Sequence, residues 1–146
     1  MKTLKGRFIP KNPQKYRGDV NKIIYRSSYE LKFMRWCDNT PDIKMWASEE
    51  VAIPYFSPVD RKMHRYFPDF LIQKKSASGD IQNVLIEIKP STQTRPPPTP
   101  NRKTKKYLND VLRYEINKAK WQAAIEWCKK GNITFSILTE QELGIK

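Results

Sequence analysis

The sequence PDFLIQKKSASGDIQNVLIEIK, residues 68–89, decides the fold of this chain. It begins inside an apolar and aromatic run at 64–73, and it ends in the best strand pattern of the sequence, at 83–89. Between the two runs, Ser-Ala-Ser-Gly-Asp at 76–80 has the composition of a turn. Two strands joined by so short a turn predict a β-hairpin.

With this hairpin included, the expected elements follow the order helix, three strands, helix, strand, which predicts one α/β domain. A helix is expected at 27–38, because Ser27 followed by Glu30 matches the capping box that opens helices. The other expected elements are a strand at 49–56, a helix at 107–130 and a strand at 133–138.

The charge of the chain is its most informative bulk property. Its 146 residues carry 28 Lys and Arg against 15 Asp and Glu, a net charge of +13. So basic a domain predicts a polyanionic partner, with nucleic acid first and an anionic membrane surface second. Residues 1–26 are expected to form an irregular basic N-terminal arm, either a mobile tail or a phosphate contact, and 27–146 a single domain.

Other classes of protein are disfavoured by composition. We expect no signal peptide and no membrane-spanning segment, because no apolar stretch is long enough. Cys37 and Cys128 are interpreted as buried free thiols, with one disulfide as the alternative. A structural zinc site is not expected, and His64 is interpreted as structural, with a role as a base as the alternative.

Strand geometry places two charged side chains together. Residues two apart in a strand share a face, so Glu87 and Lys89 lie on one face, whereas Val84, Ile86 and Ile88 line the other and are expected in the core. Charges on an otherwise apolar strand are costly to bury unpaired. They indicate either a functional site or a structural salt bridge at the strand end.

Asp69 favours the functional interpretation. The hairpin brings it within reach of Glu87, and two carboxylates in an apolar setting repel each other unless a divalent cation joins them. Ligands that are all oxygen favour Mg²⁺, with Mn²⁺ as an alternative, over zinc. The other interpretation of Asp69 is a turn residue after Pro68.

Glu30 adds a third acid from the expected first helix. At about 100° per residue, it falls within the arc of Tyr29, Phe33, Met34, Trp36 and Cys37, which we expect to be buried. Lys32, Arg35 and Asp38 are expected outside this arc. A buried acid suits a cation, so Glu30 is predicted to hold a second metal ion, with plain helix capping as the alternative.

This set of residues suits phosphodiester hydrolysis. A metal ion on Asp69 and Glu87, with the Ile88 carbonyl as a further ligand, lowers the pKa of its water and neutralises charge on the phosphate. Lys89 is expected to orient the water or stabilise the developing charge.

Pro68-Asp69, then 17 residues, then Glu87-Ile88-Lys89 resembles the PD-(D/E)xK nuclease signature. With Glu30 on a preceding helix, the arrangement looks like the endonuclease subunit of Tn7-type transposases. The chain also resembles the head completion nucleases of T4-like bacteriophages, from MKTLKGRF to PYFSPVDRKMHRYFPDF and more weakly after residue 90.

The resemblance implies a restriction-endonuclease-like α/β core, with a mixed central sheet flanked by helices. It implies a Mg²⁺-dependent nuclease that acts on phage DNA late in assembly, when packaged heads are closed and joined to tails. Portal or neck proteins of the capsid are the implied partners. The implied location is the host cytoplasm during assembly, or the virion. Neither a membrane nor a small-molecule cofactor is expected.

DNA contacts are expected around the acids and in a proline-rich loop. Arg26 and Ser28 flank Glu30 and are predicted to bind the scissile phosphate, whereas Lys120 either snorkels from an apolar helix face or reaches the site. The loop at 91–106 is a predicted flap over DNA, or else a solvated linker. Its basic residues are Arg95, Arg102, Lys103, Lys105 and Lys106.

No base-reading motif is visible, so binding is expected to depend on phosphates and to show little sequence specificity. Three hypotheses follow: a DNA nuclease, a non-catalytic DNA-binding or capsid-joining protein on a nuclease fold, and a basic adaptor for an acidic protein surface.

Overall fold

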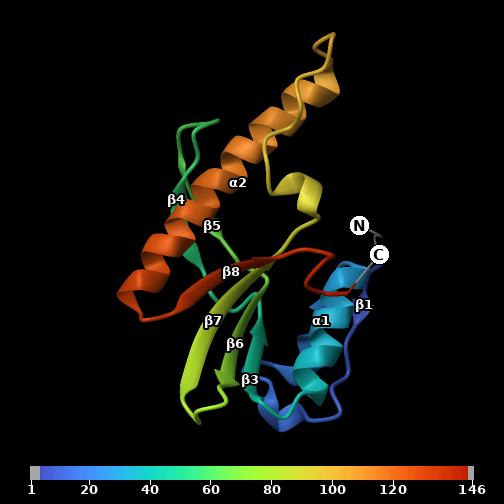
Figure 1. Cartoon of the computed structure of the whole chain (residues 1–146), viewed down its shortest axis with the longest axis vertical. Coiled ribbons are helices and arrows are strands. Elements are labelled where there is room, and N and C mark those ends of the chain that lie inside the picture. Colours follow the sequence, from blue (N-terminus) through green and yellow to red (C-terminus); the bar gives the residue numbers. More distant parts are fainter. Residues whose placement is uncertain (1–3, 145–146) are drawn as a thin grey trace.

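A four-stranded sheet in the order β3-β6-β7-β8 forms the centre of the molecule (Figure 1). The computed structural model describes residues 4–144. β3 (Ile43–Ser48), β6 (Phe70–Lys75) and β7 (Ile81–Ile88) pair antiparallel in that order, whereas β8 (Thr134–Leu138) runs parallel to β7. The sheet is therefore mixed, and the predicted hairpin is formed by β6 and β7.

Two helices cover opposite faces of this sheet. α1 (Ser28–Asn39) packs on the face that carries Ile86 and Ile88, and α2 (Lys105–Lys130) packs on the face that carries Leu85. This is the predicted α/β architecture, consistent with a restriction-endonuclease-like core. The shorter elements are β1 (Gly6–Arg7), η1 (Pro13–Lys15), η2 (Val20–Lys22), β2 (Ile24–Tyr25), β4 (Ile53–Phe56), β5 (Met63–Tyr66) and η3 (Ser91–Gln93).

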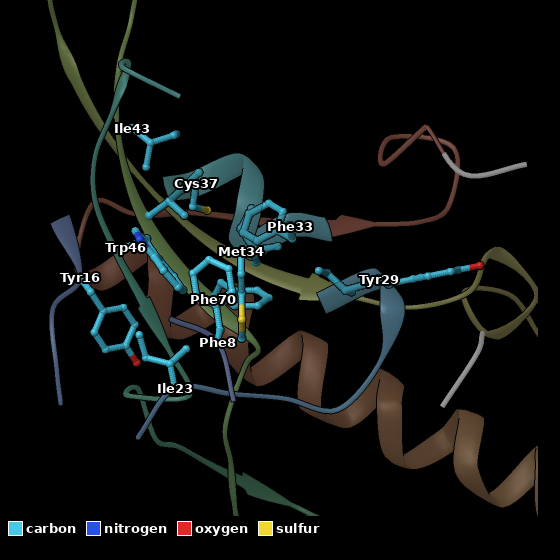
Figure 2. Packing of buried hydrophobic residues seen from close by; sticks show 13 residues of the cluster. Phe8, Tyr16, Ile23, Tyr29, Phe33, Met34, Cys37, Ile43, Trp46 and Phe70 are labelled. Atoms are coloured by element: carbon cyan, nitrogen blue, oxygen red, sulfur yellow. The ribbon is translucent and has the colours of Figure 1, made fainter. Parts of the chain in front are cut away.

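The core on the α1 side is aromatic (Figure 2). Phe33 of α1 meets Phe70 of β6 with ring centroids 4.7 Å apart, and Trp46 of β3 lies 6.3 Å from Phe70. Met34 and Cys37 complete the helix face that packs on the sheet. Cys37 and Cys128 are both buried free thiols, as predicted.

The N-terminal segment belongs to this core. Phe8, Tyr16 and Ile23 are buried among its side chains, and β1 pairs antiparallel with β2. The backbone N–H of Arg17 donates to the carbonyl of Trp46 at 2.8 Å, so the segment also covers the edge of β3. The expectation of a mobile, irregular tail is therefore wrong for residues 4–26, because three of their scattered apolar residues are buried in the core.

The predicted strand at 64–73 is two strands in different sheets. β5 ends at Tyr66, and β6 begins at Phe70. Pro68 between them has no N–H to donate to a strand ladder, so pairing is interrupted there. β5 pairs with β4 in a separate hairpin that packs on α2. β3 has no counterpart among the predicted strands.

Two residues of α1 depart from the helical-wheel expectation. Trp36 is 42% exposed, whereas Asp38, expected outside the apolar arc, is only 2% exposed. The backbone N–H groups of Lys11 and Asn12 donate to the Asp38 carboxylate at 2.8 and 2.9 Å. The N-terminal segment thus buries an acid that the helix alone would leave in water.

Within residues 4–144, no helix has both the length and the apolar character that a membrane crossing requires.

Candidate active site

The β6–β7 hairpin brings Asp69 and Glu87 together. Phe70 is paired with Ile86, so Asp69, one residue earlier, lies beside Glu87, one residue later. The backbone N–H of Ile88 donates to Asp69 Oδ2 at 2.7 Å. Glu87 is only 5% exposed, on the face of the sheet that α2 covers. The predicted acid pair is therefore present.

The surroundings of Asp69 disturb its ionisation. Burial raises the pKa of Asp69 well above its usual range, and the negative charge of Glu87 raises it further. A backbone hydrogen bond from Ile88 opposes this shift but does not cancel it. A pair of close carboxylates suits a divalent cation, which is hard and prefers oxygen ligands.

Tyr66 is a further member of the site that the sequence analysis missed. Its hydroxyl donates a hydrogen bond to Glu87 Oε2, and its ring is buried. Burial and the neighbouring charge of Glu87 raise the pKa of Tyr66, so the hydroxyl keeps its proton and remains a donor. The only signal in the sequence was a tyrosine three residues before Asp69, which is not specific.

Glu30 lies in the first turn of α1, where it is half-buried. Its backbone N–H donates to the Ser27 hydroxyl at 3.1 Å, and that hydroxyl lies 3.2 Å from Glu30 Oε2. Burial raises the pKa of Glu30, and its charge contributes to raising that of Asp69. Ser27 therefore caps the helix, and Glu30 accepts a hydrogen bond from this cap while it lies within electrostatic range of the acid pair.

A complete set of metal ligands is not preassembled. Within the described residues, no three Asp, Glu, His or Cys side chains gather closely enough to form a metal site. Asp69 and Glu87 fit a divalent cation by charge and by ligand type. Glu30 and the Ile88 carbonyl remain predictions as further ligands.

Two lysines lie on the same side of the sheet as the acids. Lys89 follows β7, and its backbone N–H donates to the Leu138 carbonyl at 3.0 Å, so the strand alternation continues and Lys89 shares the face of Glu87. Lys120 of α2 lies with Nζ 5.6 Å from the centroid of the Tyr66 ring. Burial lowers the pKa of Lys120, as does the charge of Lys89. Of the two alternatives for Lys120, the structure supports reaching the site rather than snorkelling into solvent.

Arg26 is already paired with an acid. Its guanidinium donates to Oε2 of Glu49. The sequence analysis did not single out Glu49. The backbone N–H of Glu49 donates to the carbonyl of Asp69 at 3.1 Å, and this places the ion pair next to the site. Ser28, the other predicted phosphate contact here, is half-buried in the first turn of α1.

The basic loop residues stand apart from the acid pair. The loop runs along the first half of α2, beyond the sheet (Figure 1). Its predicted phosphate contacts are exposed, although Lys106 also forms an ion pair with Asp110 at 3.6 Å. α2 begins at Lys105, so the last two of these contacts belong to the helix. The exposed residues are Arg95, Arg102, Lys103, Lys105 and Lys106.

His64 belongs to the β4–β5 hairpin rather than to the acid pair. Its Nε2 lies 2.6 Å from Asp60 Oδ2, and its ring stacks on Tyr55 at 5.7 Å. These contacts agree with the structural interpretation of this histidine.

Comparisons with known proteins identify the family of this chain. The family described as TnsA-like endonuclease N terminal matches residues 40–140, a range that contains Asp69, Glu87, Lys89 and Lys120 but not Glu30. The chain is also similar to the protein named Head completion nuclease of Enterobacteria phage T4, with 44% identity over 142 residues, 94% of this chain and 92% of that protein. The chain therefore belongs to the family of TnsA-like endonucleases.

Proposed function

We propose that this protein is a metal-dependent DNA nuclease that hydrolyses phosphodiester bonds with little sequence specificity. The observation that carries the proposal is the pair Asp69 and Glu87, side by side and largely withdrawn from water, with the pKa of Asp69 raised. Membership of an endonuclease family supports the same conclusion. The net charge of +13 supports DNA as the substrate.

Asp69 and Glu87 would hold Mg²⁺, or Mn²⁺ in its place, with the Ile88 carbonyl and Glu30 as further predicted ligands. When bound, this ion supplies an acidified water and neutralises charge on the phosphate. Tyr66 orients the Glu87 carboxylate through its hydroxyl. Lys89 and Lys120 provide positive charge on the same side of the sheet, where they stabilise charge that develops on the phosphate oxygens.

The reaction is a hydrolysis. The oxygen of water forms a bond to phosphorus, the bond between phosphorus and the leaving sugar oxygen breaks, and the sugar oxygen takes up one proton. The products are a phosphate monoester and a sugar hydroxyl. Arg26 and Ser28, beside the site, are predicted to bind the scissile phosphate, although Arg26 must then share its charge with Glu49.

The biological role that we infer is trimming of packaged phage DNA during head completion and head–tail joining. The support is the name of the similar phage T4 protein, Head completion nuclease. On this proposal the protein acts in the host cytoplasm during assembly or in the virion, and portal or neck proteins of the capsid are its partners.

The test compares the wild type with Asp69→Asn on linear and circular DNA, with Mg²⁺ and with EDTA. We expect the wild type to cleave only with Mg²⁺, and Asp69→Asn to lose at least about a hundredfold in rate, because it loses one acid of the metal site. Lys129→Gln, which removes an exposed charge at the far end of α2, is the matched control. Cleavage of circular DNA would identify an endonuclease, and cleavage of linear DNA alone an exonuclease.

A second candidate function is a non-catalytic DNA-binding or capsid-joining protein. The observation in its favour is that the described residues contain no preassembled set of three metal ligands. The same assay separates the two functions: a wild type that binds DNA but cleaves none with Mg²⁺ or Mn²⁺ would establish the second and refute the first.

A further inference from the structure

A cavity of about 340 Å³ lies between the proline-rich loop and the first half of α2. Pro97 and Pro98 belong to its wall on the loop side, and Tyr114 and Asn117 belong to its wall on the helix side. The loop and the helix run alongside each other in Figure 1. The cavity is therefore built by two segments that the acid pair does not use.

Cations outnumber acids around this cavity. Arg95, Lys106 and Arg113 line it, with Asp110 as the one acid in its lining. Asp110 is shared between Lys106 at 3.6 Å and Arg113 at 3.5 Å, which leaves the lining with two positive charges in excess. The cavity thus suits an anionic ligand.

The size of the cavity excludes duplex DNA. A sphere of its volume is roughly 9 Å across, less than the width of about 12 Å of the major groove alone. The volume falls instead in the range of small-molecule pockets, about 300–1,000 Å³. Tyr114 offers an aromatic ring for a base, and Asn117, 4% exposed, offers a carboxamide. Cations combined with an aromatic ring are typical of sites for single-stranded nucleic acid.

Helical geometry connects the cavity to the acid pair. Asp110, Arg113, Asn117 and Lys120 follow one another at spacings of three or four residues, so they share one face of α2. Lys120 lies against Tyr66, whose hydroxyl donates to Glu87. From Arg113 to Lys120, seven residues at 1.5 Å each span about 10 Å. About three stacked nucleotides, at 3.4 Å each, cover the same distance.

We propose that this cavity binds the unpaired end of a DNA strand whose duplex part lies at the acid pair. The preferred substrate is then a duplex with a single-stranded tail, rather than a blunt duplex. This inference rests on the proposed nuclease function and adds the structure of the substrate to it.

The first test is binding of the full chain in EDTA, so that no cleavage occurs. Fluorescence anisotropy compares a blunt duplex with the same duplex carrying a 5′ or 3′ tail of four thymidines. We expect one of the tailed duplexes to bind roughly tenfold more tightly, the effect of about one stacked base. Equal affinity for blunt and tailed duplexes overturns the inference.

Free thymidine monophosphate distinguishes a strand-end site from a site for free nucleotides. We compare the concentrations at which thymidine monophosphate and an unlabelled oligonucleotide of four thymidines displace the tailed duplex. The monophosphate is expected to require at least a hundredfold higher concentration. Displacement at similar concentrations overturns the inference in favour of a free nucleotide as the ligand.

The matched variants are Arg113→Gln, in the cavity, and Lys129→Gln, at the far end of the same helix. Both side chains are exposed, so each substitution removes one positive charge without disturbing the core. Arg113→Gln is expected to lose most of the tenfold advantage of the tailed duplex, and Lys129→Gln to keep it. Loss of the advantage in both variants alike overturns the site.

Cleavage with Mg²⁺ separates this inference from the proposed function. A wild type that cleaves blunt and tailed duplexes at equal rates keeps the nuclease function and overturns the inference. A protein that prefers the tail in EDTA but cleaves neither DNA refutes the nuclease function and leaves the tail-binding site standing.

Discussion

Asp69 and Glu87 place like charges side by side in a largely buried setting, and they cannot move apart without breaking the hairpin, because Glu87 lies in β7 and Asp69 directly precedes β6. Burial raises the pKa of Asp69, and the repulsion from Glu87 raises it further, so a proton or a divalent cation at this pair is favoured. A proton on Asp69 thus competes with a metal ion for the same carboxylate, so metal binding releases that proton and strengthens as pH rises.

Asp69→Asn is expected to stabilise the metal-free protein near pH 7. Because the folded pKa of Asp69 lies above its unfolded value, the folded state binds more protons between the two values, and stability falls as pH rises from about 4. Asparagine removes this loss and keeps an acceptor for the Ile88 N–H. Thermal unfolding in EDTA between pH 4 and 8 should show a gain on the order of 1 kcal/mol near pH 7. Identical pH profiles for wild type and variant would contradict the prediction.

Lys120→Met is expected to reduce Mg²⁺-dependent cleavage at least about tenfold with little change in stability. The Lys120 Nζ lies 5.8 Å from the Tyr55 ring centroid and 5.6 Å from that of Tyr66, and methionine keeps an apolar side chain there while it removes the positive charge beside the acids. The cleavage rate at saturating Mg²⁺ and the urea midpoint are the two measurements. Lys129→Met serves as the control, and an unchanged cleavage rate in Lys120→Met would exclude a role in the site.

Strand alternation was sufficient to predict which acids meet. Because residues two apart in a strand share a face, Glu87 and Lys89 were predicted to lie together, and the predicted hairpin placed Asp69 beside Glu87. Tyr66 and Glu49 could not be found in this way, because Tyr66 reaches Glu87 only after the chain leaves one sheet for another at Pro68. Their contacts depend on how separate segments pack, which no local period encodes.

At the level of elements, the best predictions were those with local signals. α1 begins after its Ser27 cap, as the capping box indicated, and α2 begins two residues before the predicted start. β3 was missed because its pairing is irregular near Ile43 and Met45 and because it follows α1 closely. The N-terminal segment was misjudged because its three buried apolar residues have no common period.

Asp38→Ala is expected to destabilise the protein by about 2–3 kcal/mol. The carboxylate accepts the backbone N–H groups of Lys11 and Asn12, and its removal leaves two partly buried donors without a partner. Urea unfolding measures the change, with the exposed Asp42→Ala as control. A loss no larger than that of the control would mean that the N-terminal segment is not anchored at this point.

The whole molecule carries a net charge of +13, and much of it lies at the exposed loop and the start of α2. Binding to phosphates releases counterions, so the logarithm of the binding constant falls linearly with the logarithm of the salt concentration. That DNA binding weakens with salt could be predicted from the composition. The cavity between loop and helix could not, because the residues that line it lie up to 25 positions apart in the chain (92 to 117).

Affinity for duplex DNA in EDTA is expected to fall about a thousandfold or more between 50 and 200 mM salt, as for proteins with about six or more phosphate contacts. Fluorescence anisotropy at several salt concentrations gives the slope. A weak dependence on salt would point to recognition through base edges instead.

The parallel pairing of β7 with β8 has a consequence for protein synthesis. Ile88 leaves the ribosome 50 residues before its partner Leu138, and translation at about 5–20 residues per second makes this delay roughly 3–10 s. During that interval the strand that carries Glu87 has an open edge. A chain whose synthesis is interrupted within α2 therefore has an acid-bearing strand with only one neighbour, and the sheet is complete only after Leu138 has been made.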